Sequence, residues 1–82
     1  MPRWVTPAAY RAANAEVAKA RQAAGLTQRD VAANLKVPPS VVAKIETGDR
    51  RLDALEVAIL AEMFGLEPRE LLHRMVTAAN LL

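Results

Sequence analysis

The side chains of this 82-residue sequence that could do chemistry are basic and hydrogen-bonding groups rather than nucleophiles. Several of them lie between residues 28 and 51: Gln28, Arg29, Lys36, Lys44, Thr47, Arg50 and Arg51. Guanidinium and ammonium groups neutralise phosphates, and amides and hydroxyls donate hydrogen bonds to phosphate oxygens. The chemistry that this set indicates is binding of a nucleic acid backbone.

The sequence has few residues of the types that carry out catalysis. Ser40 is the only serine, His73 is the only histidine, and cysteine is absent. Nucleophilic catalysis needs a nucleophile beside a base, and a metal site needs clustered ligands. We therefore expect no enzymatic activity, no metal and no cofactor, and we expect His73 on a helix surface or at the edge of a dimer.

The charge is unevenly distributed. The net charge is +2, but residues 1–52 hold nine Lys/Arg against four Asp/Glu, whereas residues 53–82 hold two against five. This asymmetry suits one surface for phosphates and another for protein, although a solvated mixture of charges is the simpler alternative.

The length and composition predict one small domain that covers residues 1–82, with 52% hydrophobic residues. A chain of this size buries only about 60% of its unfolded surface, so a partner subunit would help its stability. The absence of cysteine and of an apolar run of signal or membrane length predicts a cytoplasmic protein that does not contact a membrane.

The stretch 27–48 predicts two short helices joined by a tight turn. Thr27 and Asp30 have the spacing of a capping box, which starts the first helix. The second helix, 39–47, begins at Pro39 and ends at Gly48. Ala32 is small enough for the two helices to cross closely.

Three further helices flank this pair. Thr6-Pro7 and Gly25 bound a helix over 7–24, Asp53 and Glu56 start one that ends at Phe64, and Pro68 starts one over 68–82. Residues 1–6 form an arm. We expect the core to be closed by the apolar face of the fourth helix, Leu55, Ile59, Leu60, Met63 and Phe64, with Ala58 between them.

The last helix carries more apolar residues than one small core can use. We expect Leu71 and Leu72 to serve the core. The stripe that continues to residue 82 would then be free for a two-fold partner helix. The residues expected in this dimer interface are Leu72, Met75, Val76, Ala79 and Leu82.

Residues 21–48, from Arg-Gln-Ala-Ala-Gly-Leu-Thr-Gln to Lys-Ile-Glu-Thr-Gly, resemble the repressor and Cro type of helix-turn-helix, the XRE family. The resemblance extends from about residue 15 to residue 72. It implies an all-α fold, a compact five-helix lambda-repressor-like helix-turn-helix domain, and binding of double-stranded DNA. It also implies a partly buried ion pair between Arg21 and Glu46 that ties the first helix to the end of the recognition helix.

The resemblance assigns roles to the exposed residues of helix 39–47 and its flanks. The residues expected at base edges are Pro39, Ser40, Val41, Ala43 and Lys44. The residues expected at phosphates are Gln28, Arg29, Thr47, Arg50 and Arg51. Two positions depart from the family pattern: Lys36 replaces the usual glycine, and Pro38 replaces a serine-like cap.

The interpretation that these features favour is a homodimeric regulator of transcription, either a repressor or an autoregulator, that reads a palindromic operator in the major groove. The alternative is an antitoxin-like or phage-encoded module whose main partner is another protein. Strong salt dependence of duplex binding would favour the first, and stoichiometric binding to one protein without DNA binding would favour the second.

Overall fold

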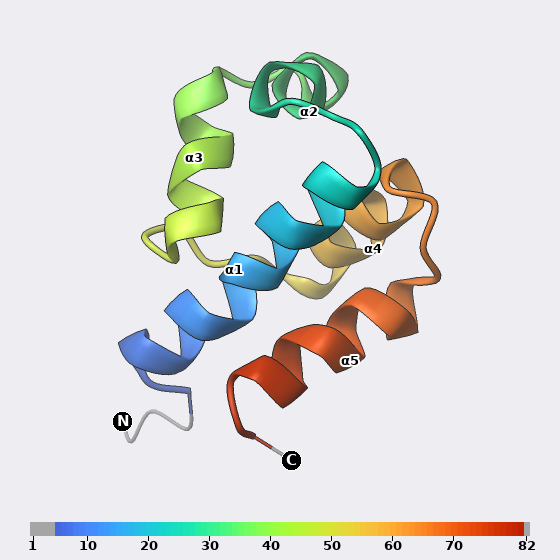
Figure 1. Ribbon diagram of the computed structural model, residues 1–82. Helices are drawn as coiled ribbons and strands as arrows, with labels where there is room; N and C mark the ends of the chain where they lie inside the picture. The colour runs from blue at the N-terminus through green and yellow to red at the C-terminus, as the bar shows by residue number, and fades with distance from the viewer. Residues whose placement is uncertain (1–4, 82) are drawn as a thin grey trace.

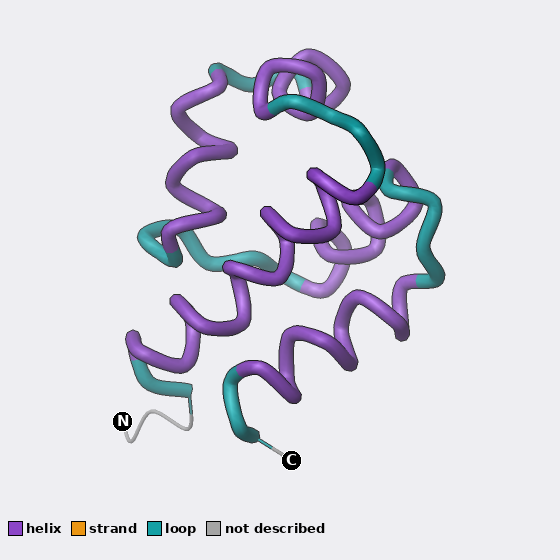
Figure 2. The backbone as a smooth tube through the Cα atoms, in the orientation of Figure 1, coloured by secondary structure: helices purple, strands orange, loops and turns teal. Residues whose placement is uncertain are grey.

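The computed structural model describes residues 5–81, which form five α-helices and no strand (Figures 1 and 2). The helices are α1 (Pro7–Ala23), α2 (Gln28–Leu35), α3 (Pro39–Thr47), α4 (Ala54–Met63) and α5 (Pro68–Ala78). The expected all-α, five-helix fold is confirmed. Within these residues, none of the helices has the length and apolar character needed to cross a membrane.

The helix starts follow from local hydrogen bonds. The Thr6 hydroxyl accepts the Ala9 amide at 3.1 Å, ahead of Pro7 in the first turn of α1. Thr27 and Asp30 form the expected capping box of α2, and Asp53 and Glu56 form that of α4. Each box satisfies two amides that the helix itself leaves unpaired.

The turn between α2 and α3 is tight and partly strained. Lys36 caps α2 in the left-handed region, at φ 58° and ψ 45°. A lysine in that conformation costs about 1 kcal/mol relative to glycine. Pro38 then precedes α3 without a side-chain capping bond, as its missing hydroxyl predicts.

α1 is the element on which the others assemble. In Figure 1 it runs through the middle of the molecule, with α5 along one side, α3 on the other and α2 across its far end. The largest fully buried apolar side chains come from all five helices: Val17, Val31, Val42, Leu60 and Leu71. Ala32 is also buried, which lets α2 and α3 cross closely.

The face of α4 that enters the core is not the expected one. Leu55 and Ile59 are 76% and 51% exposed, whereas Val57 and Ala61 are buried beside Leu60 and Phe64. α4 is apolar around most of its circumference, so its sequence has no polar stripe to mark the outer face. The prediction that Leu55 and Ile59 close the core was wrong.

The division of α5 also differs from expectation. Met75 is buried with Leu71 in the core, so it is not available to a partner subunit, whereas Leu72 is 49% exposed. The helix ends at Ala78, and Asn80 takes a positive φ of 63° that turns the chain. Ala79 is a half-buried cap that packs against the core, and Leu82 and residues 1–4 of the arm lie outside the described residues.

Candidate nucleic-acid interface

The face of α3 that points away from the core is short and carries one cation. Val42 and Ile45 are buried and fix the orientation of the helix. The side chains left exposed on α3 are Pro39, Ser40, Lys44 and Thr47, and Ala43 is half-buried between them. Four of the five residues expected at base edges therefore lie on this face, with Lys44 as its only cation.

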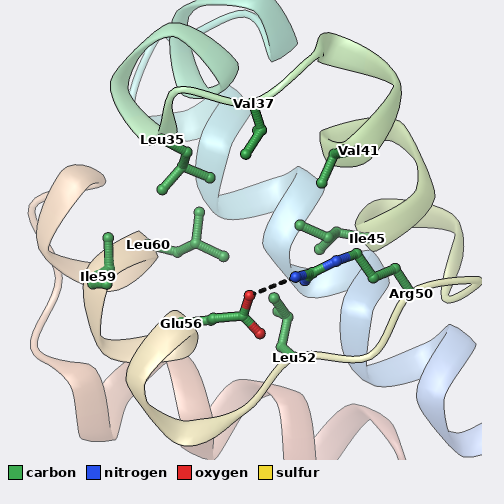
Figure 3. Close-up of a pocket in the computed structure, with 9 residues that line it drawn as sticks. All are labelled: Leu35, Val37, Val41, Ile45, Arg50, Leu52, Glu56, Ile59 and Leu60. Carbon is green, nitrogen blue, oxygen red and sulfur yellow. Dashed lines mark hydrogen bonds and ion pairs between the residues drawn. The ribbon is translucent and has the colours of Figure 1, made fainter.

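Val41 does not share that face. It packs against the core and lines a cavity of about 180 Å³ between the α2–α3 turn and α4. Figure 3 shows Val41 among the residues that line this cavity, above Ile45. This position is a correction to the expected base contact, because helical spacing alone did not separate a half-buried valine from an exposed one.

The start of α2 offers hydrogen-bond donors to an anion. The Thr27 hydroxyl accepts a hydrogen bond from the Asp30 amide, so the amides of Gln28 and Arg29 remain as donors in the first turn. Arg29 is exposed. The Thr27 amide donates to Asp30 and lowers the pKa of that carboxyl, so a negative charge stays next to this donor site.

Gln28 is half-buried and belongs to a polar network that reaches the core. Arg21 donates to Glu46 from Nε to Oε2 at 2.7 Å and from Nη2 to Oε1 at 3.1 Å. Its Nη1 donates to the Leu26 carbonyl at 2.8 Å, and Gln28 Nε2 donates to Glu46 Oε1 at 3.0 Å. This network joins α1, the start of α2 and the end of α3.

The Arg21–Glu46 pair is largely removed from solvent, with side chains 11% and 7% exposed. The hydrogen bond to Glu46 raises the pKa of Arg21, so the guanidinium is charged at any physiological pH. The bidentate geometry fixes both side chains in orientation. The ion pair expected from the family resemblance is present and links α1 to the end of α3.

The loop after α3 holds its two arginines against the body of the protein. Arg50 Nη2 donates to Glu56 Oε2 at 2.7 Å, as the dashed line in Figure 3 shows, and its Nη1 donates to the Arg51 carbonyl at 3.2 Å. The hydrogen bond from Arg50, followed by that from the Asp53 amide, lowers the pKa of Glu56. Arg51 lies over the Tyr10 ring, with Cζ 4.7 Å from the ring centroid.

Thr47 is also engaged. Its hydroxyl lies 3.2 Å from the Lys44 carbonyl and 3.1 Å from Asp49 Oδ2. A phosphate at this position would compete with Asp49 for the hydroxyl proton. The five expected phosphate contacts come from two segments next to α3: Gln28 and Arg29 from the first turn of α2, and Thr47, Arg50 and Arg51 from the end of α3 and the loop after it.

Sequence reasoning missed the contacts that hold the loop against α1. Asn14 is 1% exposed, and its Nδ2 donates to the Arg50 carbonyl at 3.1 Å. Gly48, at φ 86°, approaches α1 so closely that an added Cβ would lie 2.7 Å from Arg11 Cα. An asparagine between the core residues Ala13 and Val17 was the one available signal, because a buried amide requires a partner.

A model of the family described as helix-turn-helix matches residues 17–71, close to the span of the sequence resemblance and well over half of the chain. Searches with the chain find no matching curated protein and no matching solved structure. The matched residues include α2 and α3, the Arg21–Glu46 pair and the loop after α3 that carries Arg50 and Arg51. The chain therefore belongs to the XRE type of helix-turn-helix proteins, a family of DNA-binding regulators of transcription.

Proposed function

We propose that this protein is a homodimeric, sequence-specific regulator, a repressor or an autoregulator, that inserts α3 into the major groove of an operator. The observation that carries the proposal is the arrangement around α3. The exposed side chains of α3 lie beside two groups of candidate phosphate contacts: the first turn of α2, which the Gln28–Glu46 hydrogen bond joins to α3, and the loop after α3 with Arg50 and Arg51. Phosphate anchors beside a groove-reading helix fix its register on the duplex.

The base contacts divide by chemistry. Lys44 is the candidate for guanine O6 and N7, Ser40 can donate or accept, and Ala43 and Pro39 offer apolar contact to thymine methyls. Lys44→Ala should change the preferred sequence more than the overall affinity. A uniform loss across sequences would instead make Lys44 a phosphate anchor.

The phosphate contacts are assigned to Gln28 and Arg29 in the first turn of α2 and to Thr47, Arg50 and Arg51 at the end of α3 and in the loop after it. Arg50 can serve a phosphate while it stays paired with Glu56, because a guanidinium has five N–H donors. These contacts carry no sequence information but supply much of the affinity and its salt dependence.

A groove beside α5 supports the dimer. Leu72 and Val76 of α5 line a cavity of about 240 Å³ together with Leu81 and Val5. Leu72 and Leu81 are 49% and 43% exposed, an apolar surface that a two-fold partner would cover. Two copies would place their α3 helices about 34 Å apart, one helical turn of DNA.

Sedimentation tests this interface. Leu72→Glu combined with Val76→Thr should yield monomers, whereas Leu55→Glu on α4 is the matched control on another exposed leucine. A dimer that survives the α5 changes but not Leu55→Glu would move the interface to α4. Met75 is excluded from this test because its substitution would open the core.

Selection of bound sequences from a random duplex pool at two salt concentrations tests the function as a whole. A palindromic motif that persists at the higher salt is expected. Salt-sensitive binding without a motif would reduce the role to non-specific DNA binding. A protein with this role works in the cytoplasm, where its DNA is.

The second candidate function is a module that grips another protein. It is favoured by two exposed apolar residues of α4, Leu55 and Ile59, of which Ile59 lines the cavity together with Val37 and Val41. Exposed apolar groups next to a cavity suit a protein partner. Absence of duplex binding at low salt, with a one-to-one complex that Leu55→Glu disrupts, would replace the regulator by this module.

A further inference from the structure

The first half of α1 lies outside the family match, which begins at residue 17, yet it packs against the loop that follows the recognition helix. In Figure 1 the loop between α3 and α4 lies next to this half of α1, and both reach the side of the molecule where α3 stands. Contacts that this segment makes are features of this chain rather than of the matched family region.

Three contacts fix α1 against the loop. Asn14 bonds the Arg50 carbonyl, Tyr10 lies under the Arg51 guanidinium, and the backbone of Arg11 touches Gly48. An alanine Cβ at Gly48 would lie 2.7 Å from Arg11 Cα and 2.9 Å from Arg11 Cγ. The Arg11 side chain therefore starts next to Gly48, which directly follows Thr47 at the C-terminal end of α3.

The charge of Arg11 is available. Its side chain is exposed, and none of the four ion pairs within residues 5–81 involves it. The one acidic residue of α1, Glu16, pairs with Lys19 at 2.9 Å. The backbone of Arg11 is fixed against Gly48, and its guanidinium is in none of these ion pairs. Such a side chain is suited to bind a phosphate.

The loop itself is less cationic than its two arginines suggest. Glu56 balances the charge of Arg50 at 2.7 Å, and Asp49 lies between Thr47 and Arg50 in the chain. Of the two loop guanidiniums, Arg50 would share its charge between Glu56 and a phosphate, whereas Arg51 is in no ion pair within residues 5–81. Arg11, whose backbone contacts Gly48, would supply a second guanidinium that is in no ion pair within residues 5–81.

We propose that Arg11 is an additional DNA-backbone contact, which with Arg51 forms a phosphate site at the C-terminal end of α3. The inference rests on the proposed DNA-binding function and deepens it. It extends the binding surface from the matched helix-turn-helix region onto the first turns of α1. Because the contact is to a phosphate, it strengthens binding to every sequence alike.

The test is fluorescence anisotropy on a mixed-sequence duplex of roughly 30 base pairs, titrated with the full chain at several salt concentrations. Arg11→Gln should lower the salt slope by about 0.9 and weaken binding about five- to tenfold at 0.1 M salt. Arg11→Lys, which keeps the charge, should restore most of the slope. Arg69→Gln removes the same charge from the exposed start of α5 and should leave the slope unchanged.

The outcomes separate the two proposals. If the wild-type chain binds duplex and Arg11→Gln keeps its slope, Arg11 makes no contact while the DNA-binding function stands. Equal losses in Arg11→Gln and Arg69→Gln would show an effect of net charge and overturn the local contact. If the wild-type chain binds no duplex at low salt, both proposals fall. Thermal unfolding of each variant by circular dichroism confirms that an affinity loss is not a loss of fold.

Discussion

Two arginine–glutamate pairs of this protein have the same short distance but opposite surroundings. Arg21–Glu46 and Arg50–Glu56 both have an N–O distance of 2.7 Å, yet the first pair is 11% and 7% exposed and the second 42% and 32%. Burial strengthens the attraction but makes an unpaired partner costly, whereas water screens an exposed pair. The comparison teaches that burial, not distance, decides which pair stabilises the fold and which can exchange partners.

The largest expected effect comes from breaking the buried pair. Glu46→Ala leaves the Arg21 guanidinium without its counter-charge beside the Leu26 carbonyl, so the free energy of unfolding should fall by about 3–5 kcal/mol. Urea denaturation at neutral pH measures the loss.

The control for that prediction is Glu70→Ala, which breaks the exposed Glu70–Arg74 pair and should cost less than about 1 kcal/mol. The double change Arg21→Met with Glu46→Leu should recover much of the loss, because no charge is left buried. Equal losses for Glu46→Ala and Glu70→Ala would remove burial as the explanation.

The second effect concerns DNA rather than folding. Arg50→Ala combined with Arg51→Ala should weaken binding to all duplexes and flatten the salt slope by about two units. Anisotropy titrations at several salt concentrations measure it. An unchanged slope would mean that both arginines only hold the loop to Glu56 and Tyr10.

A smaller effect is expected on stability from the exposed pair. Arg50→Ala should lower the free energy of unfolding by about 1 kcal/mol or less, although it breaks a bond as short as that of Arg21. Denaturation of both single variants side by side compares them. A loss as large as that of Glu46→Ala would make the exposed pair a structural one.

The smallest effect is on pH dependence. Arg50 and the Asp53 amide hold the pKa of Glu56 below its ordinary value in the folded state, so the unfolded state takes up protons first as the pH falls. Glu56 therefore contributes to the free energy of unfolding at pH values above its ordinary pKa, and this contribution is lost as the pH falls below that value. In a plot of melting temperature against pH, Glu56→Gln should give a smaller decrease at acid pH than the wild type, and Arg50→Ala should do the same. A decrease as large as that of the wild type in both variants would contradict the assignment.

Much of the fold was predictable because its signals are local. The capping boxes of α2 and α4 and the prolines at the starts of α1, α3 and α5 mark all five helix starts with signals that span only a few residues. The face of α4 was not predictable, since Leu55 and Val57 are both apolar and only the packing of α4 against α5 and the rest of the core decides between them.

The candidate site was predictable in its residue types but not in its contacts. The sequence placed Lys44 and Arg51 on the surface, yet Val41 turned out to line a cavity. The bond from Asn14 to the Arg50 carbonyl joins residues 36 positions apart, and no local rule connects them. The roles of these residues toward DNA stay predictions.

The Pro38–Pro39 step has a consequence in the unfolded chain. Both prolines sit where their fixed φ fits, with Pro38 at φ −62° and Pro39 in the first turn of α3. They restrict the conformations that the denatured turn can sample, which stabilises the native state by about 0.4–1 kcal/mol for each proline. That entropic gain is large enough to offset the left-handed Lys36 two residues earlier, so the chain keeps a tight turn without the glycine that usually makes one.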